Sequence, residues 1–171
     1  AAGATMWNDV AALREPGALE TAAELRCDVV LMHMLGEPRT MQDAPAYDDV
    51  VGEVEAFLLA RAEAAVAAGV ARARLWLDPG IGFGKTADHN LALIAALPQL
   101  VAHGYPVVLG ASRKRFLAAL HPGAKDAGDR LGGSLAAALA GAAAGVAAVR
   151  VHDVRETAQA LAVWEAIESA R

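Results

Sequence analysis

Cysteine, lysine and long hydrophobic runs are scarce in this sequence of 171 residues. The single cysteine, Cys27, excludes an internal disulfide and is typical of a reducing compartment, so we expect a cytoplasmic location. No apolar run approaches the roughly 20 residues that a membrane-spanning helix needs, and the first residues do not resemble a signal peptide. The sequence therefore predicts no membrane association.

Acidic residues outnumber basic ones, 20 to 15, and the formal net charge is −5. This balance argues against general nucleic-acid binding, which relies on excess positive charge. Only three basic residues are lysines: Lys85, Lys114 and Lys125. Two of these follow apolar runs, in turns rich in glycine or serine, and that placement indicates a binding site rather than a solvated charged face.

Short apolar runs alternate with helical patterns along the whole chain. The apolar runs predict strands at 5–8, 29–32, 75–78, 107–109 and 147–151. Helices are expected at 16–25, 47–68, 90–100, 113–120, 130–144 and 157–169. Uninterrupted apolar strands joined by helical crossovers are typical of a parallel sheet. With 56% hydrophobic residues and no linker, residues 1–171 are expected to form a single α/β domain.

Each predicted strand ends in polar or ionisable residues. Because the carboxyl ends of parallel strands share one edge of a sheet, these side chains should converge on a ligand site. They are Asn8 and Asp9, His33, Asp78, Ser112 to Arg115, and Arg150 to Asp153.

The stretch 75–85 is the most informative of these strand ends. Asp78 follows an apolar run, and Pro79 with three glycines disfavours a helix cap there. Lys85 suggests a phosphate-binding loop, but that motif needs a glycine where this chain has Pro79, so we reject it. His33, between two methionines, is expected to be a buried core histidine. Metal binding by protein side chains has no support from ligand spacing.

Two kinds of chemistry can be assigned to the remaining strand ends. An arginine inside a parallel strand is costly unless it meets an anion, so Arg150, with His152 on the same face, suits a phosphate. Asp78 and Asn8 can accept from and donate to a ring that carries several N–H groups. Lys114 is expected between the two groups. The residues alone therefore predict a site for an anion and a heterocycle.

Six motifs resemble those of dihydropteroate synthase, the bacterial folate-pathway family, and they occur along the chain in the family's order and spacing. Three are longer: Asp-Pro-Gly-Ile-Gly-Phe-Gly-Lys at 78–85, Gly-Ala-Ser-Arg-Lys-Arg-Phe at 110–116 and Arg-Val-His-Asp-Val at 150–154. Three are shorter: Asn-Asp-Val at 8–10, Leu-Met-His-Met at 31–34 and Pro-Arg-Thr-Met-Gln at 38–42. The resemblance covers the whole chain and is specific as a set.

The resemblance implies a (β/α)8 TIM barrel, of which about five βα units are present and the first three would lie upstream of Ala1. It also implies a transferase that joins 6-hydroxymethyl-7,8-dihydropterin diphosphate to p-aminobenzoate and releases diphosphate. Mg²⁺ would arrive with the diphosphate, with its protein ligand expected upstream. The family is usually homodimeric and is a sulfonamide target. A chain of five units alone should expose the edge at 5–10 and be poorly stable or inactive.

The motifs also imply a pterin pocket. Asn8 and Asp78 would hydrogen-bond the ring nitrogens and the amino group, and Lys114 would contact the carbonyl edge. Met32 and Gly110 would line the ring pocket. Asp78 and Lys114 would be catalytic by charge, because the family mechanism is dissociative and uses no protein nucleophile.

The motifs further imply where the other substrate groups bind. Arg150, the third catalytic residue, and His152 would hold the diphosphate, and Phe83 and Ser112 would border p-aminobenzoate. Three alternatives stay open at this stage: a non-catalytic pterin-binding relative, a methyltransferase-type pterin domain, and a structural fragment that packs with a partner chain.

Overall fold

The computed structural model describes residues 3–37, 39–41 and 43–171, and within these the strands are all parallel. β1 (Met6–Asp9), β2 (Asp28–Met32) and β3 (Leu75–Asp78) form one sheet in that order. β4 (Val108–Leu109) pairs with β5 (Ala148–Val149), and a parallel bridge between Leu77 and Val107 joins the two sheets. Neighbours in sequence are thus neighbours in space, which is the order of a singly wound sheet.

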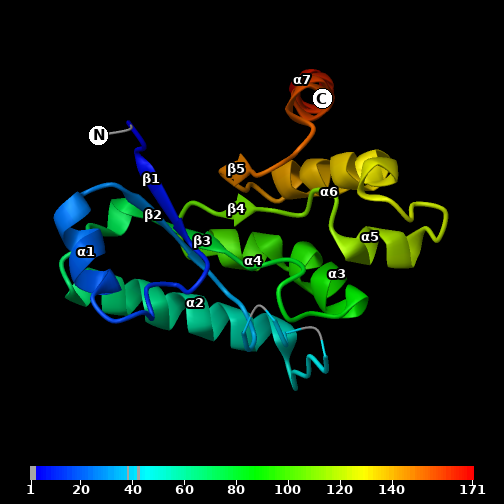
Figure 1. Cartoon of the computed structure of the whole chain (residues 1–171). Helices are drawn as coiled ribbons and strands as arrows, with labels where there is room; N and C mark the ends of the chain where they lie inside the picture. The colour runs from blue at the N-terminus through cyan, green and yellow to red at the C-terminus, as the bar shows by residue number, and fades with distance from the viewer. Residues whose placement is uncertain (1–2, 38, 42) are drawn as a thin grey trace.

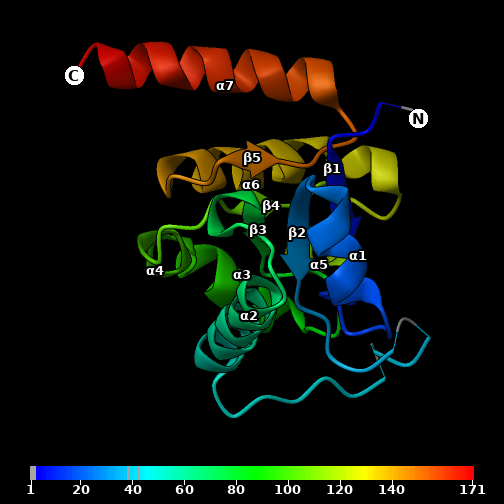
Figure 2. The same cartoon turned by 90° about the vertical axis from the view of Figure 1, so that its left-hand side faces the viewer.

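Each strand is followed by at least one helix (Figure 1). The helices are α1 (Ala18–Leu25), α2 (Val50–Ala67), α3 (Ala87–Ala95), α4 (Leu97–Ala102), α5 (Arg115–Leu120), α6 (Leu131–Ala143) and α7 (Val154–Ser169), with 3₁₀ turns η1 (Arg72–Arg74) and η2 (Ala127–Arg130). The last helix, α7, lies across α6 and away from the strands (Figure 2). Among the described residues, no helix is both long and apolar enough to cross a membrane.

The two faces of the strands carry different residues. One face, with Leu31, Leu77 and Leu109, packs against the helices in a continuous hydrophobic core. Side chains alternate along a strand, so the residues between these belong to the other face. The register and the contacts at the strand ends place five predicted site residues on that second face: Asn8, Met32, Asp78, Gly110 and Arg150.

Most predicted elements are present, but several bounds are wrong. The helix predicted at 90–100 is two helices, because Pro98 in the first turn of α4 cannot donate to the preceding turn. The helix predicted at 113–120 begins at Arg115, since Arg113 has a φ of +58°. α7 begins three residues early, at Val154, and α1 begins two residues late, at Ala18.

The strand predicted at 147–151 is also too long. β5 ends at Val149, so Arg150 and His152 lie beyond the strand and are exposed. The prediction that Arg150 is an arginine buried inside a strand is therefore wrong. Of the motif at 38–42, Pro38 and Gln42 lie outside the described residues.

Candidate active site

Asp78 ends β3 as a buried carboxylate, with 2% of its surface exposed. Its Oδ1 accepts the N–H of Gly80 at 2.7 Å, and its carbonyl accepts the N–H of His33 at 3.1 Å. Burial raises the pKa of Asp78, whereas the Gly80 N–H and the charges of Arg150, Lys114 and Lys85 lower it. A carboxylate with this environment can accept from a ligand that brings its own N–H donors.

The turn after Asp78 lies directly against the loop that follows β2. Gly80 has a φ of +68°, and a Cβ there would lie 1.8 Å from the carbonyl oxygen of His33. Gly84, with a φ of +64°, would place a Cβ 2.7 Å from the carbonyl oxygen of Leu35. Only glycine permits both this backbone conformation and this approach.

Gly80→Ala should therefore lower the free energy of unfolding by roughly 3 kcal/mol, because it adds left-handed strain and a backbone clash. Gly132→Ala is the matched control: Gly132 lies in α6, and a Cβ added there would have no atom of another element within 4 Å. Alanine there should be neutral or stabilise α6 by up to about 1 kcal/mol. Urea unfolding measures both variants, and equal stabilities would contradict the close approach.

Lys114 and Phe83 form the next part of the site. Lys114 is the N-cap residue of α5, and its Nζ lies 4.0 Å from the centre of the Phe83 ring. Burial and the charge of Arg150 lower the pKa of Lys114, and Asp78 raises it. The Lys114 side chain passes so close to Gly82 that a Cβ there would lie 3.1 Å from its Cδ. The Phe83 ring therefore packs against the Lys114 ammonium group, which also interacts electrostatically with Asp78.

Arg150 and His152 follow β5 and face the loop after β4. A Cβ on Gly110 would lie 3.2 Å from the Arg150 guanidinium, so the glycine makes room for that group. In the described part of the chain, no carboxylate pairs with Arg150. Ser112, which is buried, accepts the backbone N–H of His152 at 3.2 Å and lies 3.1 Å from its Nδ1. These contacts place the side chains of Arg150 and His152 beside the loop after β4.

An ion pair between Arg113 and Asp153 holds the loop after β4, and no periodic pattern in the sequence indicates this ion pair. Arg113, in its left-handed conformation, donates to both carboxylate oxygens of Asp153, through Nε at 3.0 Å and through Nη2. Its backbone N–H donates to Ser134 Oγ and its carbonyl accepts from Arg130, both at 2.9 Å. Strain of this kind persists only where surrounding contacts hold it, and here it sets the positions of Ser112 and Lys114.

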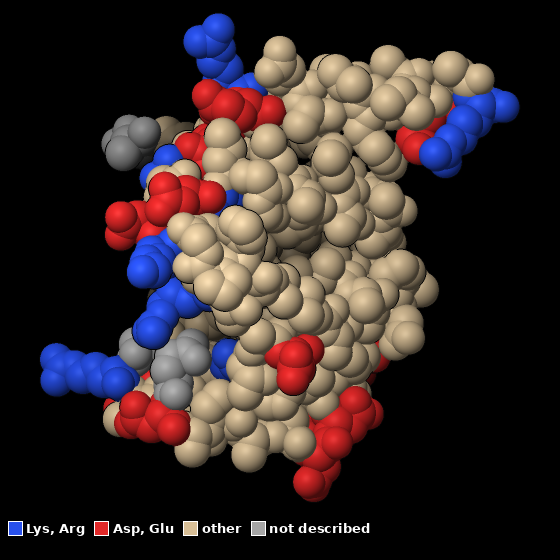
Figure 3. Space-filling view, turned by 90° about the vertical axis from the view of Figure 1, so that its right-hand side faces the viewer, with Lys and Arg blue, Asp and Glu red and all other residues tan. Residues whose placement is uncertain are grey.

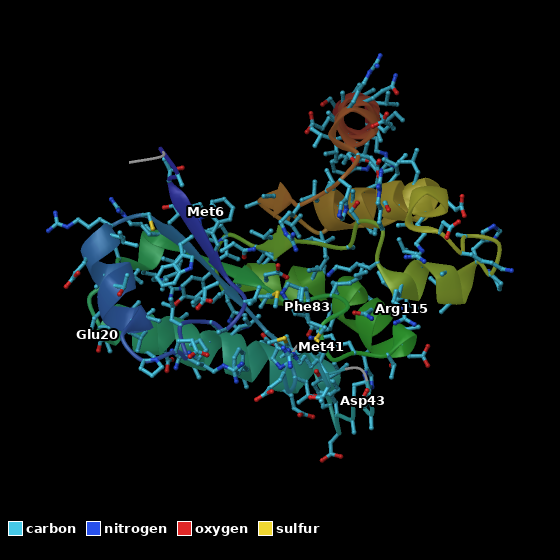
Figure 4. All side chains as sticks on the ribbon, in the orientation of Figure 1. Met6, Glu20, Met41, Asp43, Phe83 and Arg115 are labelled. Atoms are coloured by element: carbon cyan, nitrogen blue, oxygen red, sulfur yellow. The ribbon has the colours of Figure 1, made fainter. Side chains whose placement is uncertain are left out.

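A cavity of about 580 Å³ opens beside these loops. Its charged lining is entirely basic: Lys85, Arg113, Lys114 and Arg115. Met41 also lines the cavity, and Figure 4 labels Met41, Arg115 and Phe83 in this part of the molecule. In the face shown in Figure 3, most Lys and Arg side chains lie along one edge, interspersed with Asp and Glu, while the middle carries few charged side chains. The cavity can hold an aromatic molecule that carries negative charge.

Comparison with known proteins decides the family. The family described as pterin binding enzyme matches residues 1–152. This chain belongs to the pterin-binding enzyme family. A dihydropteroate synthase of Neisseria meningitidis serogroup C is 51% identical over 167 residues, which are 96% of this chain and 59% of that protein.

Two solved structures extend the likeness to the fold of the pterin-binding family. Dihydropteroate synthase of Xanthomonas albilineans with 4-aminobenzoic acid has a TM-score of 0.91 and 51% identity, over 97% of this chain and 58% of that one. The Thermus thermophilus enzyme with 6HMPPP has a TM-score of 0.91 and 47% identity, over 97% and 65%. The chain thus spans about three fifths of the relatives that it matches.

Within this family member, strand register or close approach joins all but one of the predicted site residues in pairs: Met32 with Asp78, Phe83 with Lys114, Gly110 with Arg150, and Ser112 with His152. Asn8 is the exception: it lies on the same strand face but is exposed on β1, two positions before the level of Asp78. Met32, with 1% exposure, is the register partner of Asp78. His33 is buried and hydrogen-bonded, as predicted.

Proposed function

We propose that this chain carries the pterin and arylamine sites of a dihydropteroate synthase. The observation that carries the proposal is the buried carboxylate of Asp78 at the end of β3, within the electrostatic reach of Lys114 and Arg150. The substrates named in the related structures, 4-aminobenzoic acid and 6HMPPP, support it. The substrates would be 6-hydroxymethyl-7,8-dihydropterin diphosphate and p-aminobenzoate.

In this proposal the pterin ring lies over the face of the strands that carries Asp78 and Met32. Its ring N–H and amino group donate to Asp78, and Lys114 donates to its carbonyl edge. Met32, which is buried, and Gly110 would line the ring pocket. Asn8 would reach the ring from β1. The negative charge of Asp78 then stabilises the positive charge that develops on the pterin as the leaving group departs.

The leaving group would sit at Arg150 and His152. The bond between the pterin methylene carbon and the diphosphate oxygen breaks, and both electrons leave with the oxygen. The amino nitrogen of p-aminobenzoate, which packs between Phe83 and Ser112, then bonds to the methylene carbon and loses a proton to solvent. Arg150 supplies a forked donor that matches phosphate oxygens. Catalysis rests on positioning and charge rather than on a protein nucleophile.

We also propose that any Mg²⁺ enters with the diphosphate. The described residues contain no group of three or more His, Cys, Asp or Glu that could hold a metal ion, and the side chains at the diphosphate end are basic. These residues do not fit a protein site for the ion, so no step is assigned to it. A cytoplasmic location, which would keep Cys27 reduced, is part of the same proposal.

The proposed architecture is an arc of about five βα units of a (β/α)8 barrel. The sequential parallel strand order and the single helix-covered face support it. The family resemblance also leads us to propose a homodimer. Its candidate surface is the apolar groove between α6 and α7, where Val163 and Ile167 are 56% and 54% exposed.

Val163→Glu with Ile167→Glu tests the proposed dimer surface. Charges placed in an apolar interface cost more than the contacts that they replace, so the dissociation constant of the dimer should rise at least about tenfold. Light scattering with size-exclusion chromatography measures the mass. A wild-type protein that is monomeric, or a variant dimer of unchanged affinity, would rule this surface out.

The activity is tested with the protein as its gene encodes it, supplied with both substrates. We expect diphosphate release that requires p-aminobenzoate, together with formation of 7,8-dihydropteroate. Binding of the pterin without reaction would instead indicate a non-catalytic relative. Binding of neither substrate would indicate a structural fragment.

A further inference from the structure

Lys85 is a buried amine that the proposed reaction does not use, and burial lowers its pKa to about 7. Only 3% of its surface is exposed, yet no carboxylate among the described residues lies within 4.0 Å of its ammonium group. Its Nζ lies 2.9 Å from Nδ1 of His33, and it donates to the carbonyl of Phe83 at 3.0 Å. Burying an ammonium group in this way is costly, so a purely space-filling residue would serve the fold better.

The His33 ring, which contacts Lys85, is held in its neutral form. Burial and the charges of Lys85 and Arg14 lower the pKa of His33 to about 3, so its ring is uncharged near neutral pH. Nδ1 of this neutral ring faces Lys85, and the Lys85 Nζ also lies 3.5 Å from the His33 carbonyl oxygen. The ring packs edge-on against Phe57, with centres 5.0 Å apart. His33 is therefore a fixed anchor at the end of β2.

From this anchor, contacts lead to the proposed arylamine site. Lys85 fixes the Phe83 carbonyl, and Tyr47 fixes the next carbonyl, that of Gly84, through its hydroxyl at 2.8 Å. The Phe83 ring in turn lies against Nζ of Lys114. The carbonyls of Phe83 and Gly84 are thus tied to the loop after β2, while the Phe83 N–H donates to the Gly80 carbonyl within its own turn at 3.0 Å.

We propose that Lys85 is a positioning residue that sets the Phe83 ring against Lys114, and that it thereby controls binding of the arylamine substrate rather than of the pterin. This inference rests on the proposed function for the identity of that substrate. The effect of Lys85 on the Phe83 ring itself requires no substrate. Lys85 acts through the Phe83 backbone, whereas Asp78 would receive the pterin directly.

The test is Lys85→Met, made in the protein as its gene encodes it. Methionine keeps the length of the side chain and removes the donors and the charge. We expect the KM for p-aminobenzoate to rise about tenfold, as for loss of one hydrogen bond to a positioning group. The Kd for the pterin should rise by less, because there Lys85 contributes only its charge near Asp78. Lys85→Arg should restore part of the loss. The matched control is Lys125→Met, at an exposed lysine, which should change neither value.

A spectroscopic measurement separates this role from a merely structural one. The chain has three phenylalanines, so fluorine NMR of fluorophenylalanine-labelled protein can follow Phe83 after assignment with Phe83→Leu. In the protein without substrates, Lys85→Met should shift or broaden the Phe83 resonance, and Lys125→Met should not. An unmoved resonance, or equal losses for pterin and p-aminobenzoate, would overturn the positioning role. A wild type that binds no p-aminobenzoate would overturn the proposed function, while the resonance still decides the role of Lys85.

Discussion

Asp78→Asn should abolish tight pterin binding while leaving the protein folded. Asparagine keeps an oxygen that can accept the Gly80 N–H, but it turns an NH₂ group towards ring nitrogens that are themselves donors. Losing two hydrogen bonds to a charged acceptor costs about 3–6 kcal/mol, or roughly 10² to 10⁴ in affinity. Calorimetric titration with the dihydropterin measures the change. Asp48→Asn, at an exposed aspartate, is the control, and a Kd unchanged in Asp78→Asn would refute the role of Asp78.

The same variant should change how stability depends on pH. Because burial raises the pKa of Asp78, the folded protein holds a proton there that the unfolded chain has already lost. Stability contributed by this group is therefore present at low pH, and it falls as pH rises from the ordinary aspartate value to the raised one. Pterin affinity should rise across the same window, since the ligand binds the carboxylate. Urea unfolding and pterin titration at several pH values should show both trends in the difference between wild type and Asp78→Asn, because the titration of His33 is common to the two proteins.

Arg150→Met should weaken the diphosphate-bearing substrate and spare the free alcohol. The Arg150 guanidinium is exposed and lies beside Gly110, so methionine should not alter the fold. Loss of a forked, charge-assisted contact to phosphate should reduce affinity for the pterin diphosphate by roughly 10- to 100-fold. Affinity for 6-hydroxymethyl-7,8-dihydropterin should change by less than about twofold, because that ligand has no group at Arg150.

Arg150→Lys separates charge from geometry. Lysine keeps the charge but not the two parallel donors, so an intermediate affinity is expected. The titrations are best made with each ligand alone, without p-aminobenzoate. Equal losses for the diphosphate and the alcohol would mean that Arg150 supports the fold of the site instead of holding the leaving group.

The strand ends could be predicted from the sequence because buried parallel strands are continuous apolar runs. The apolar runs stop at Met32 and after Leu77, and the structure indeed ends β2 at Met32 and β3 at Asp78. The resemblance to a known family, rather than the pattern, then suggests what each polar residue binds. The family itself is confirmed by the match over residues 1–152.

Contacts between distant loops could not be predicted in the same way. Lys85 meets His33 across 52 residues of sequence, and Arg113 meets Asp153 across 40. Neither pair belongs to a periodic pattern. The left-handed conformation is at Arg113 rather than at a glycine, so the sequence does not indicate it. The strand predicted at 147–151 is too long because Val151 continues the apolar pattern after the backbone has left the sheet. These features depend on tertiary packing, which local sequence does not encode.

A crystal structure of the protein with 6-hydroxymethyl-7,8-dihydropterin diphosphate tests directly whether Asp78 receives the pterin ring at the end of β3. We predict ring N–H groups within about 3 Å of the Asp78 carboxylate and phosphate oxygens at the Arg150 guanidinium. A pterin bound elsewhere, or bound with its ring away from Asp78, would contradict both the proposed pocket and the proposed role of its carboxylate.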